Sequence, residues 1–85
     1  MNNKLEIFKK KILYRAGYRG TKEMDILLTS FVNKYINTFD ENLLIELEKF
    51  LNFEDEIIYN YYHNDIVEEK LKDNKILKIF KNHKI

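Results

Sequence analysis

The stretch Arg19-Gly20-Thr21-Lys22-Glu23 separates two segments in which apolar residues recur every three or four positions. This spacing places apolar side chains on one face of a helix. The apolar residues of the first segment are Leu5, Phe8, Ile12 and Ala16, and those of the second are Met24, Leu27, Leu28, Phe31, Val32, Tyr35 and Ile36. The stretch is therefore predicted to be the turn between two helices, at residues 4–17 and 22–37, the second of which is the expected hub of the core.

The residues of this turn have ordinary structural explanations. Gly20 is one of two glycines in a chain without proline, and we expect it to end the first helix in the left-handed conformation, where glycine has no Cβ to clash. Thr21 is the expected N-cap of the second helix, and Glu23 and Asp25 place negative charge in its first turn. Arg19 suits the last turn of the first helix, because a cation is favourable at that end of the helix dipole.

Helical spacing continues through the rest of the chain. Asp40 is the expected N-cap of a third helix that ends near residue 51. The stretch Asn52-Phe53-Glu54-Asp55-Glu56 supplies an acidic start to a short fourth helix that ends near His63-Asn64. The spacing over residues 65–72 leaves a packed connector and a loose helical turn both open. Asp73 is expected to cap a last helix.

No alternating strand pattern competes with these helical periods. We therefore predict an all-α fold, a compact bundle of about five short helices. Residues 1–85 are expected to form a single domain, with a frayed tail at residues 83–85.

Composition excludes several classes of protein. The chain has no cysteine, so neither a disulfide framework nor a thiolate metal site is possible, and a reducing compartment, the bacterial cytoplasm, is expected. Fifteen Lys and Arg residues against 14 Asp and Glu residues give a net charge of +1, which disfavours nucleic-acid binding. No apolar run reaches the roughly 18–20 residues of a membrane span, and the N-terminal residues lack the features of a signal peptide, so a mature chain without membrane insertion is expected.

No catalytic constellation is present either. His63 and His83 have no partner at ligand spacing, and Ser30, the only serine, has no nearby base. We therefore predict neither a metal site nor an enzyme. The run Tyr59-Asn60-Tyr61-Tyr62 cannot face inward throughout, so at least one ring is expected to be exposed, in an interface or as ordinary surface.

Two runs, Tyr14 to Leu28 and Asp55 to Tyr61, resemble the succinate dehydrogenase FAD assembly factor family of bacteria and mitochondria. The signature of that family, Arg-Gly-x-x-Glu, is present as Arg19, Gly20 and Glu23, followed by Met24 and Asp25. The resemblance covers about residues 12–62 in order. The family's tryptophan near Asn60-Tyr61 is absent, and Tyr61 is the aromatic residue that would replace it.

The resemblance implies a helical bundle that binds the flavoprotein subunit of succinate dehydrogenase, or of fumarate reductase, and promotes covalent attachment of FAD to it. Such a factor has no cofactor of its own, and direct contact with FAD is left open. A monomer is expected. The partner-binding residues that we predict are Arg15, Arg19, Gly20, Glu23, Asp25, Tyr59 and Tyr61.

The predicted partner-binding role can be tested by substitution. Arg19→Ala and Glu23→Ala are both expected, as exposed substitutions, to leave stability almost unchanged and to reduce flavinylation. The alternative function is a small helical nucleic-acid-binding or regulatory interaction module, using a helix-turn-helix around Gly20 and the C-terminal lysines; the near-neutral charge disfavours it.

Overall fold

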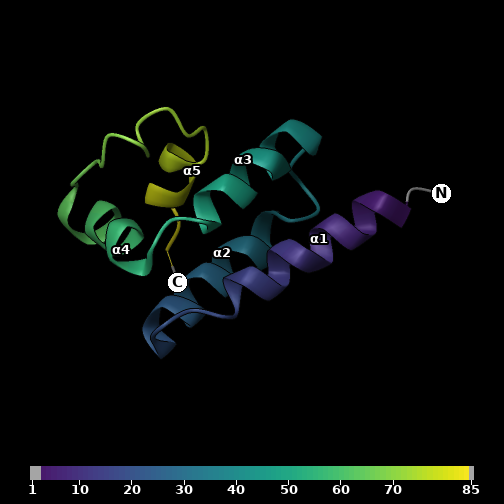
Figure 1. Ribbon diagram of the computed structural model, residues 1–85, viewed down its shortest axis with the longest axis horizontal. Coiled ribbons are helices and arrows are strands. Elements are labelled where there is room, and N and C mark those ends of the chain that lie inside the picture. The colour runs from purple at the N-terminus through teal and green to yellow at the C-terminus, as the bar shows by residue number, and fades with distance from the viewer. Residues whose placement is uncertain (1–2, 85) are drawn as a thin grey trace.

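The computed structural model describes residues 3–84, which form five α-helices and no strand (Figure 1). This confirms the predicted all-α class. The helices are α1 (Asn3–Ala16), α2 (Lys22–Tyr35), α3 (Glu41–Leu51), α4 (Asp55–Asn64) and α5 (Leu77–Lys81). The first four agree closely with the predicted ranges, and α5 is a single short helix near the C-terminus.

The helices pack in two groups that share one core. Helix α1 runs along one side of the molecule and contacts both α2 and α3, whereas α5 lies against α4 and reaches α3 through the rings of Phe50 and Phe80, whose centroids are 4.9 Å apart (Figure 1). The connections between the first four helices are short, so residues distant in sequence meet at the ends of the bundle. The most important of these contacts is between the α1–α2 turn and the α3–α4 turn.

Helix α2 contributes five buried residues to the core, one more than α3. Its buried residues are Met24, Leu27, Leu28, Phe31 and Val32. The fully buried ring of Phe31 lies 5.0 Å from that of Phe80 and 5.4 Å from that of His83, both in edge-to-face geometry. Because these contacts join the second helix to the end of the chain, the C-terminal segment completes the core.

Two of the three predicted N-caps are confirmed and one is wrong. The Thr21 hydroxyl accepts the Met24 N–H at 3.2 Å, and the Asp40 carboxylate accepts the Leu43 N–H at 2.9 Å. In place of Asp73, the side chain of Asn74 accepts the Ile76 N–H at 2.8 Å, before α5 begins. A short polar side chain can accept from the N–H two residues further on, and this turn leads the chain into α5.

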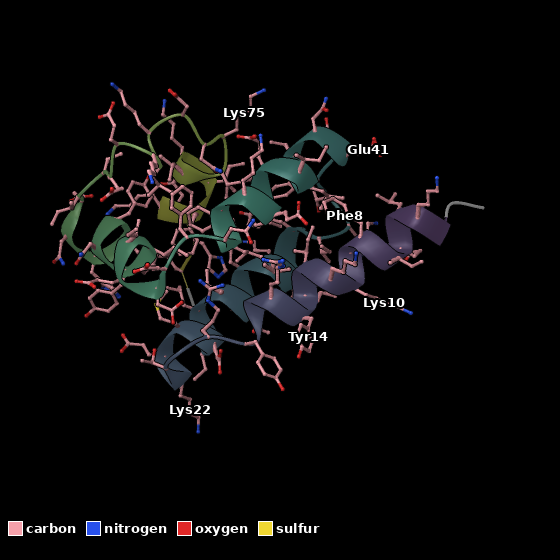
Figure 2. The ribbon with its side chains drawn as sticks, viewed as in Figure 1. Phe8, Lys10, Tyr14, Lys22, Glu41 and Lys75 are labelled. Carbon is pink, nitrogen blue, oxygen red and sulfur yellow. The ribbon has the colours of Figure 1, made fainter. Side chains whose placement is uncertain are left out.

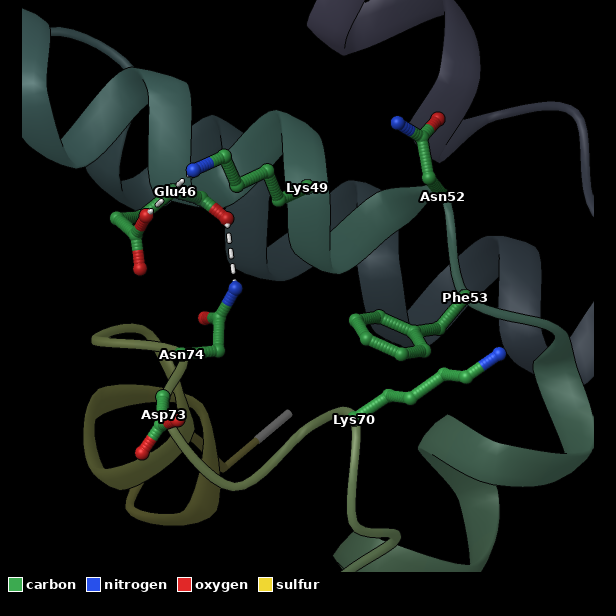
Figure 3. A pocket seen from close by; sticks show the side chains of 7 residues that line it. All are labelled: Glu46, Lys49, Asn52, Phe53, Lys70, Asp73 and Asn74. Carbon is green, nitrogen blue, oxygen red and sulfur yellow. Dashed lines mark hydrogen bonds and ion pairs between the residues drawn. The ribbon is translucent and has the colours of Figure 1, made fainter.

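Residues 65–72, for which sequence leaves two structures open, form an exposed connector that ends in a turn, and Leu71 is its one buried residue. Leu71 is fully buried, and further along the chain the Asn74 amide donates to the Glu46 carbonyl at 3.0 Å. The Lys75 N–H donates to the Glu46 carboxylate at 3.0 Å, and this hydrogen bond is the main cause of the lowered pKa of Glu46. Figure 3 shows the hollow of about 370 Å³ between α3 and this segment, where Glu46 lies beside Asn74 and Lys49. These polar groups pair with one another, so the hollow has a structural explanation.

The segment after α5 is packed as well. The ring of His83, a residue expected in the frayed tail, is 3% exposed, and its Nε2 lies 3.0 Å from the Ser30 hydroxyl. The Tyr62 hydroxyl donates to the His83 carbonyl at 2.5 Å. Ile85 lies outside the described residues. His83 is thus held by α2 and α4, and nonlocal contacts of this kind leave no mark in the local sequence.

His83 is expected to make the fold less stable in mild acid. Burial and, to a smaller extent, the positive charge of Lys34 lower the pKa of His83 below its usual 6.5. As the pH falls below about 6.5, the unfolded chain takes up this proton before the folded chain does. The free energy of unfolding should therefore be highest above that pH and decrease toward the lowered pKa of the folded state.

Urea unfolding at about pH 7.5 and about pH 5.5 measures this decrease. His83→Gln should remove most of it. His63→Gln is the matched control, because the His63 side chain is 40% exposed, and this variant should keep the decrease. An equal decrease in wild type and His83→Gln would show that another group is responsible.

Candidate functional site

The α1–α2 turn, residues 17–21, forms a corner that lies against the α3–α4 turn, residues 52–54. Helix α1 ends where the Gly17 N–H donates to the carbonyls of Leu13 and Tyr14, at 3.2 and 3.1 Å. Thr21 then begins α2 as its N-cap. The corner therefore consists of a few residues without regular structure, and its shape depends on what holds the intervening backbone.

Arg19 makes the hydrogen bonds that hold this corner against the α3–α4 turn, and we call this set of contacts with Asp55 the clamp. Its Nε donates to Asp55 Oδ1 at 2.7 Å, and its two terminal nitrogens donate to the carbonyls of Leu51 and Phe53, at 2.8 and 2.9 Å. Leu51 is the last residue of α3, where carbonyls lack partners within the helix and a cation is favourable. With 8% of its side chain exposed, Arg19 is a framework residue that ties the corner to the C-terminal end of α3.

Asp55, the first residue of α4, completes the clamp. While Oδ1 accepts from Arg19, Oδ2 accepts the Gly20 N–H at 2.7 Å. A carboxylate at the start of a helix is also stabilised by the helix dipole. Asp25 acts in the same way from α2, because its Oδ1 accepts the Arg19 N–H at 2.8 Å. Carboxylates from two helices thus hold two successive backbone N–H groups.

Gly20 plays a different part from the one predicted. No glycine among residues 3–84 has a positive φ, so the expectation of a left-handed Gly20 is wrong; the described residue with positive φ is Asp65, at 57°, which ends α4. A Cβ on Gly20 would lie 3.3 Å from Asp55 Oδ2. The corner therefore favours glycine because the Asp55 carboxylate approaches its backbone closely.

The exposed side of the corner is a shallow acidic and aromatic surface. Glu23 is the most prominent group there, with 68% of its side chain exposed, and its carboxylate lies 3.9 Å from His63 Nε2. Tyr59, 38% exposed, lies with its ring centroid 4.3 Å from that of His63. A hollow of about 360 Å³ lies between α2 and α4, lined by Thr21, Glu23, Met24, Asp55, Glu56 and Tyr59.

The seven predicted partner-binding residues thus differ in position. Glu23 and Tyr59 line the hollow, whereas Arg19, Gly20 and Asp25 take part in the hydrogen bonds that hold the corner. Arg15 is exposed at the edge and donates to the Asn52 side chain. Tyr61 points into the core, 8% exposed, with its hydroxyl donating to the Leu77 carbonyl at 2.9 Å. Sequence reasoning missed Asp55, since it stands 36 positions from Arg19.

The structure offers little for other kinds of site. Over residues 3–84, no three His, Cys, Asp or Glu side chains are grouped so that they could hold a metal ion. None of the helices in that range has the length and apolar character needed to cross a membrane. The corner is thus the site with the most organised polar geometry.

Comparison with known proteins places this chain in a family. The family model described as "Flavinator of succinate dehydrogenase" matches residues 10–84. The mitochondrial succinate dehydrogenase assembly factor 2 of Scheffersomyces stipitis is 37% identical over 79 residues, which are 88% of this chain and 53% of that protein. The mitochondrial succinate dehydrogenase assembly factor 2-B of Drosophila ananassae is 32% identical over 85 residues, which are 96% of this chain and 52% of that protein.

The chain thus spans about half the length of these curated relatives. The family match, by contrast, covers nearly all of the chain and includes the whole of the corner, its Asp55 clamp and the C-terminal segment. On this match, the chain belongs to the family of flavinators of succinate dehydrogenase.

Proposed function

We propose that this chain is an assembly factor that binds the flavoprotein subunit of succinate dehydrogenase and promotes covalent attachment of FAD to that subunit. The observation that carries the proposal is the family match over residues 10–84. The intact Arg-Gly-x-x-Glu signature, present as Arg19, Gly20 and Glu23, supports it. The role needs no catalytic residue in this chain, because the chemistry takes place on the partner.

The geometry suggests how a binding protein could promote this reaction. Glu23 lies at the start of α2, next to the corner. The backbone of the corner is held by Asp25 and Asp55, so little conformational entropy is lost when a partner binds there. Its carboxylate accepts charge-assisted hydrogen bonds, and the flavoprotein would supply an arginine, a lysine or backbone N–H groups. Tyr59 offers an aromatic ring beside it. Held in this way, the flavoprotein and its bound FAD would be kept in the arrangement that the covalent step requires.

The same proposal covers the cofactor and the client. The chain would carry no cofactor of its own, and FAD would be attached to the partner; contact between the chain and FAD is not required. The client is the flavoprotein of succinate dehydrogenase or of fumarate reductase. We propose a monomer in the bacterial cytoplasm, although the relatives described above are named as mitochondrial.

In-gel flavin fluorescence of the denatured flavoprotein subunit tests this role, because covalently attached FAD survives denaturation and noncovalent FAD does not. Cells that produce the subunit with and without this chain are compared at equal amounts of subunit. We expect the fluorescent band to be dim without the chain and bright with it. Equal fluorescence in both would contradict the proposal.

A further inference from the structure

A second surface, which we call the α1 stripe, consists of Ile7, Lys10, Lys11 and Tyr14 on α1 and of Tyr18 in the turn that follows. Ile7, Tyr14 and Tyr18 have large side chains that are 56%, 63% and 74% exposed. Tyr14 stands seven positions after Ile7 on α1, so these two side chains share one helical face, and Tyr18 follows two residues after the helix ends. In Figure 2, Lys10 and Tyr14 both project from the same side of α1, away from the other helices.

The α1 stripe borders a groove between α1 and α3. The groove has a volume of about 610 Å³ and is lined by Ile7, Lys10, Lys11, Tyr14, Arg15 and Glu48. Three of these side chains are cationic and one is anionic. Within residues 3–84, neither Lys10 nor Lys11 forms an ion pair, so both charges are available to a partner.

The two tyrosines form an ordered aromatic pair at one end of this surface. The rings of Tyr14 and Tyr18 stack with centroids 4.5 Å apart. Stacked rings lose little freedom on binding, and tyrosine is enriched in the centres of protein interfaces, whereas lysine belongs to their rims. Exposed apolar and aromatic groups rimmed by charge are typical of a protein-binding surface.

We propose that the α1 stripe docks an acidic segment of the flavoprotein subunit that also carries apolar side chains. The apolar side chains would cover Ile7, Tyr14 and Tyr18, while acidic ones would pair with Lys10 and Lys11. The choice of partner rests on the proposed function. Tyr18 directly precedes Arg19, so the α1 stripe ends at the corner and one partner can cover both surfaces. Two linked contacts bind more tightly than either alone.

Binding of the purified variants to the purified flavoprotein subunit, measured by calorimetry at low and high salt, tests this inference. The variants are Lys10→Glu/Lys11→Glu and Tyr14→Ala/Tyr18→Ala. The control is Lys72→Glu/Lys78→Glu, which makes the same charge change at exposed positions far along the chain. We expect each stripe variant to bind about tenfold or more weakly than wild type with unchanged circular dichroism, and the control to bind like wild type. The charge variant should also lose most of the salt dependence.

The outcomes separate the inference from the proposed function. If wild type does not bind the subunit, the proposed function fails and the inference falls with it. If wild type binds and either stripe variant binds equally well, or the control is weakened as much, the α1 stripe is not the docking surface and the proposed function stands. Vesicles of phosphatidylglycerol and phosphatidylcholine form a further arm; binding to them through Lys10 and Lys11, with unchanged binding to the subunit, would assign the α1 stripe to a lipid surface instead.

Discussion

Asp55→Ala should lower the free energy of unfolding by about 2–3 kcal/mol, because it leaves the Arg19 guanidinium largely buried without its counterion. The Gly20 N–H loses its acceptor in the same substitution. The 23% exposure of the Asp55 side chain lets water replace part of the interaction, so we expect less than the full cost of breaking a buried ion pair. Urea unfolding at neutral pH measures the change.

Asp73→Ala is the matched control for Asp55→Ala. Asp73 is exposed and does not cap α5, so its substitution should change the free energy of unfolding by no more than about 0.5 kcal/mol. Equal stability of the two variants would show that the contacts of Asp55 contribute little. Arg19→Ala should be destabilising as well, and the double variant should cost less than the sum of the two single changes, since both remove the same ion pair.

Glu23→Ala is expected to have the opposite profile, with intact stability and a large loss of flavinylation. Glu23 is 68% exposed and lies 3.9 Å from the His63 ring, so removing it should change the free energy of unfolding by no more than about 0.5 kcal/mol. If Glu23 is a main contact of the partner, the yield of covalent flavin should fall about tenfold or more. Flavin fluorescence of the subunit from cells carrying the variant measures this loss.

Glu41→Ala provides the control for Glu23→Ala. Both glutamates are exposed and lie in the first turn of a helix, so both changes remove the same favourable interaction with the helix dipole. Glu41 lies at the start of α3, away from the corner, and its loss should leave flavinylation unchanged. A similar loss in both variants would point to a general effect of charge.

Local sequence was sufficient to predict most of the fold. Helices α1 to α4 follow from the spacing of apolar residues, and Thr21 and Asp40 cap their helices because a cap needs only a suitable side chain at the correct position. The last helix was harder, because α5 is short and the competing cap, Asn74, stands beside Asp73. The burial of His83 depends on Ser30 and Tyr62, which are far away in sequence.

The candidate site, like the fold, could be predicted from sequence only in part. The position of the corner and the exposure of Glu23 follow from the motif and the helix boundaries. The clamp does not, because nothing near Arg19 in the sequence indicates that Asp55 and the end of α3 will meet it. The structure thereby changes the expectation for Arg19→Ala from a neutral surface change to a loss of stability. It also moves Tyr61 from the predicted interface into the core.

The most direct test of Glu23 as the partner contact uses purified components. The flavoprotein subunit without covalent flavin is incubated with FAD and with equal concentrations of wild type, Glu23→Ala or Glu41→Ala, each shown to be folded by circular dichroism. Covalent flavin on the denatured subunit is then measured. We predict high yields with wild type and Glu41→Ala and a yield with Glu23→Ala close to that without any factor. Equal yields with all three proteins would contradict the assignment of Glu23 and leave the exposed corner without a role in flavinylation.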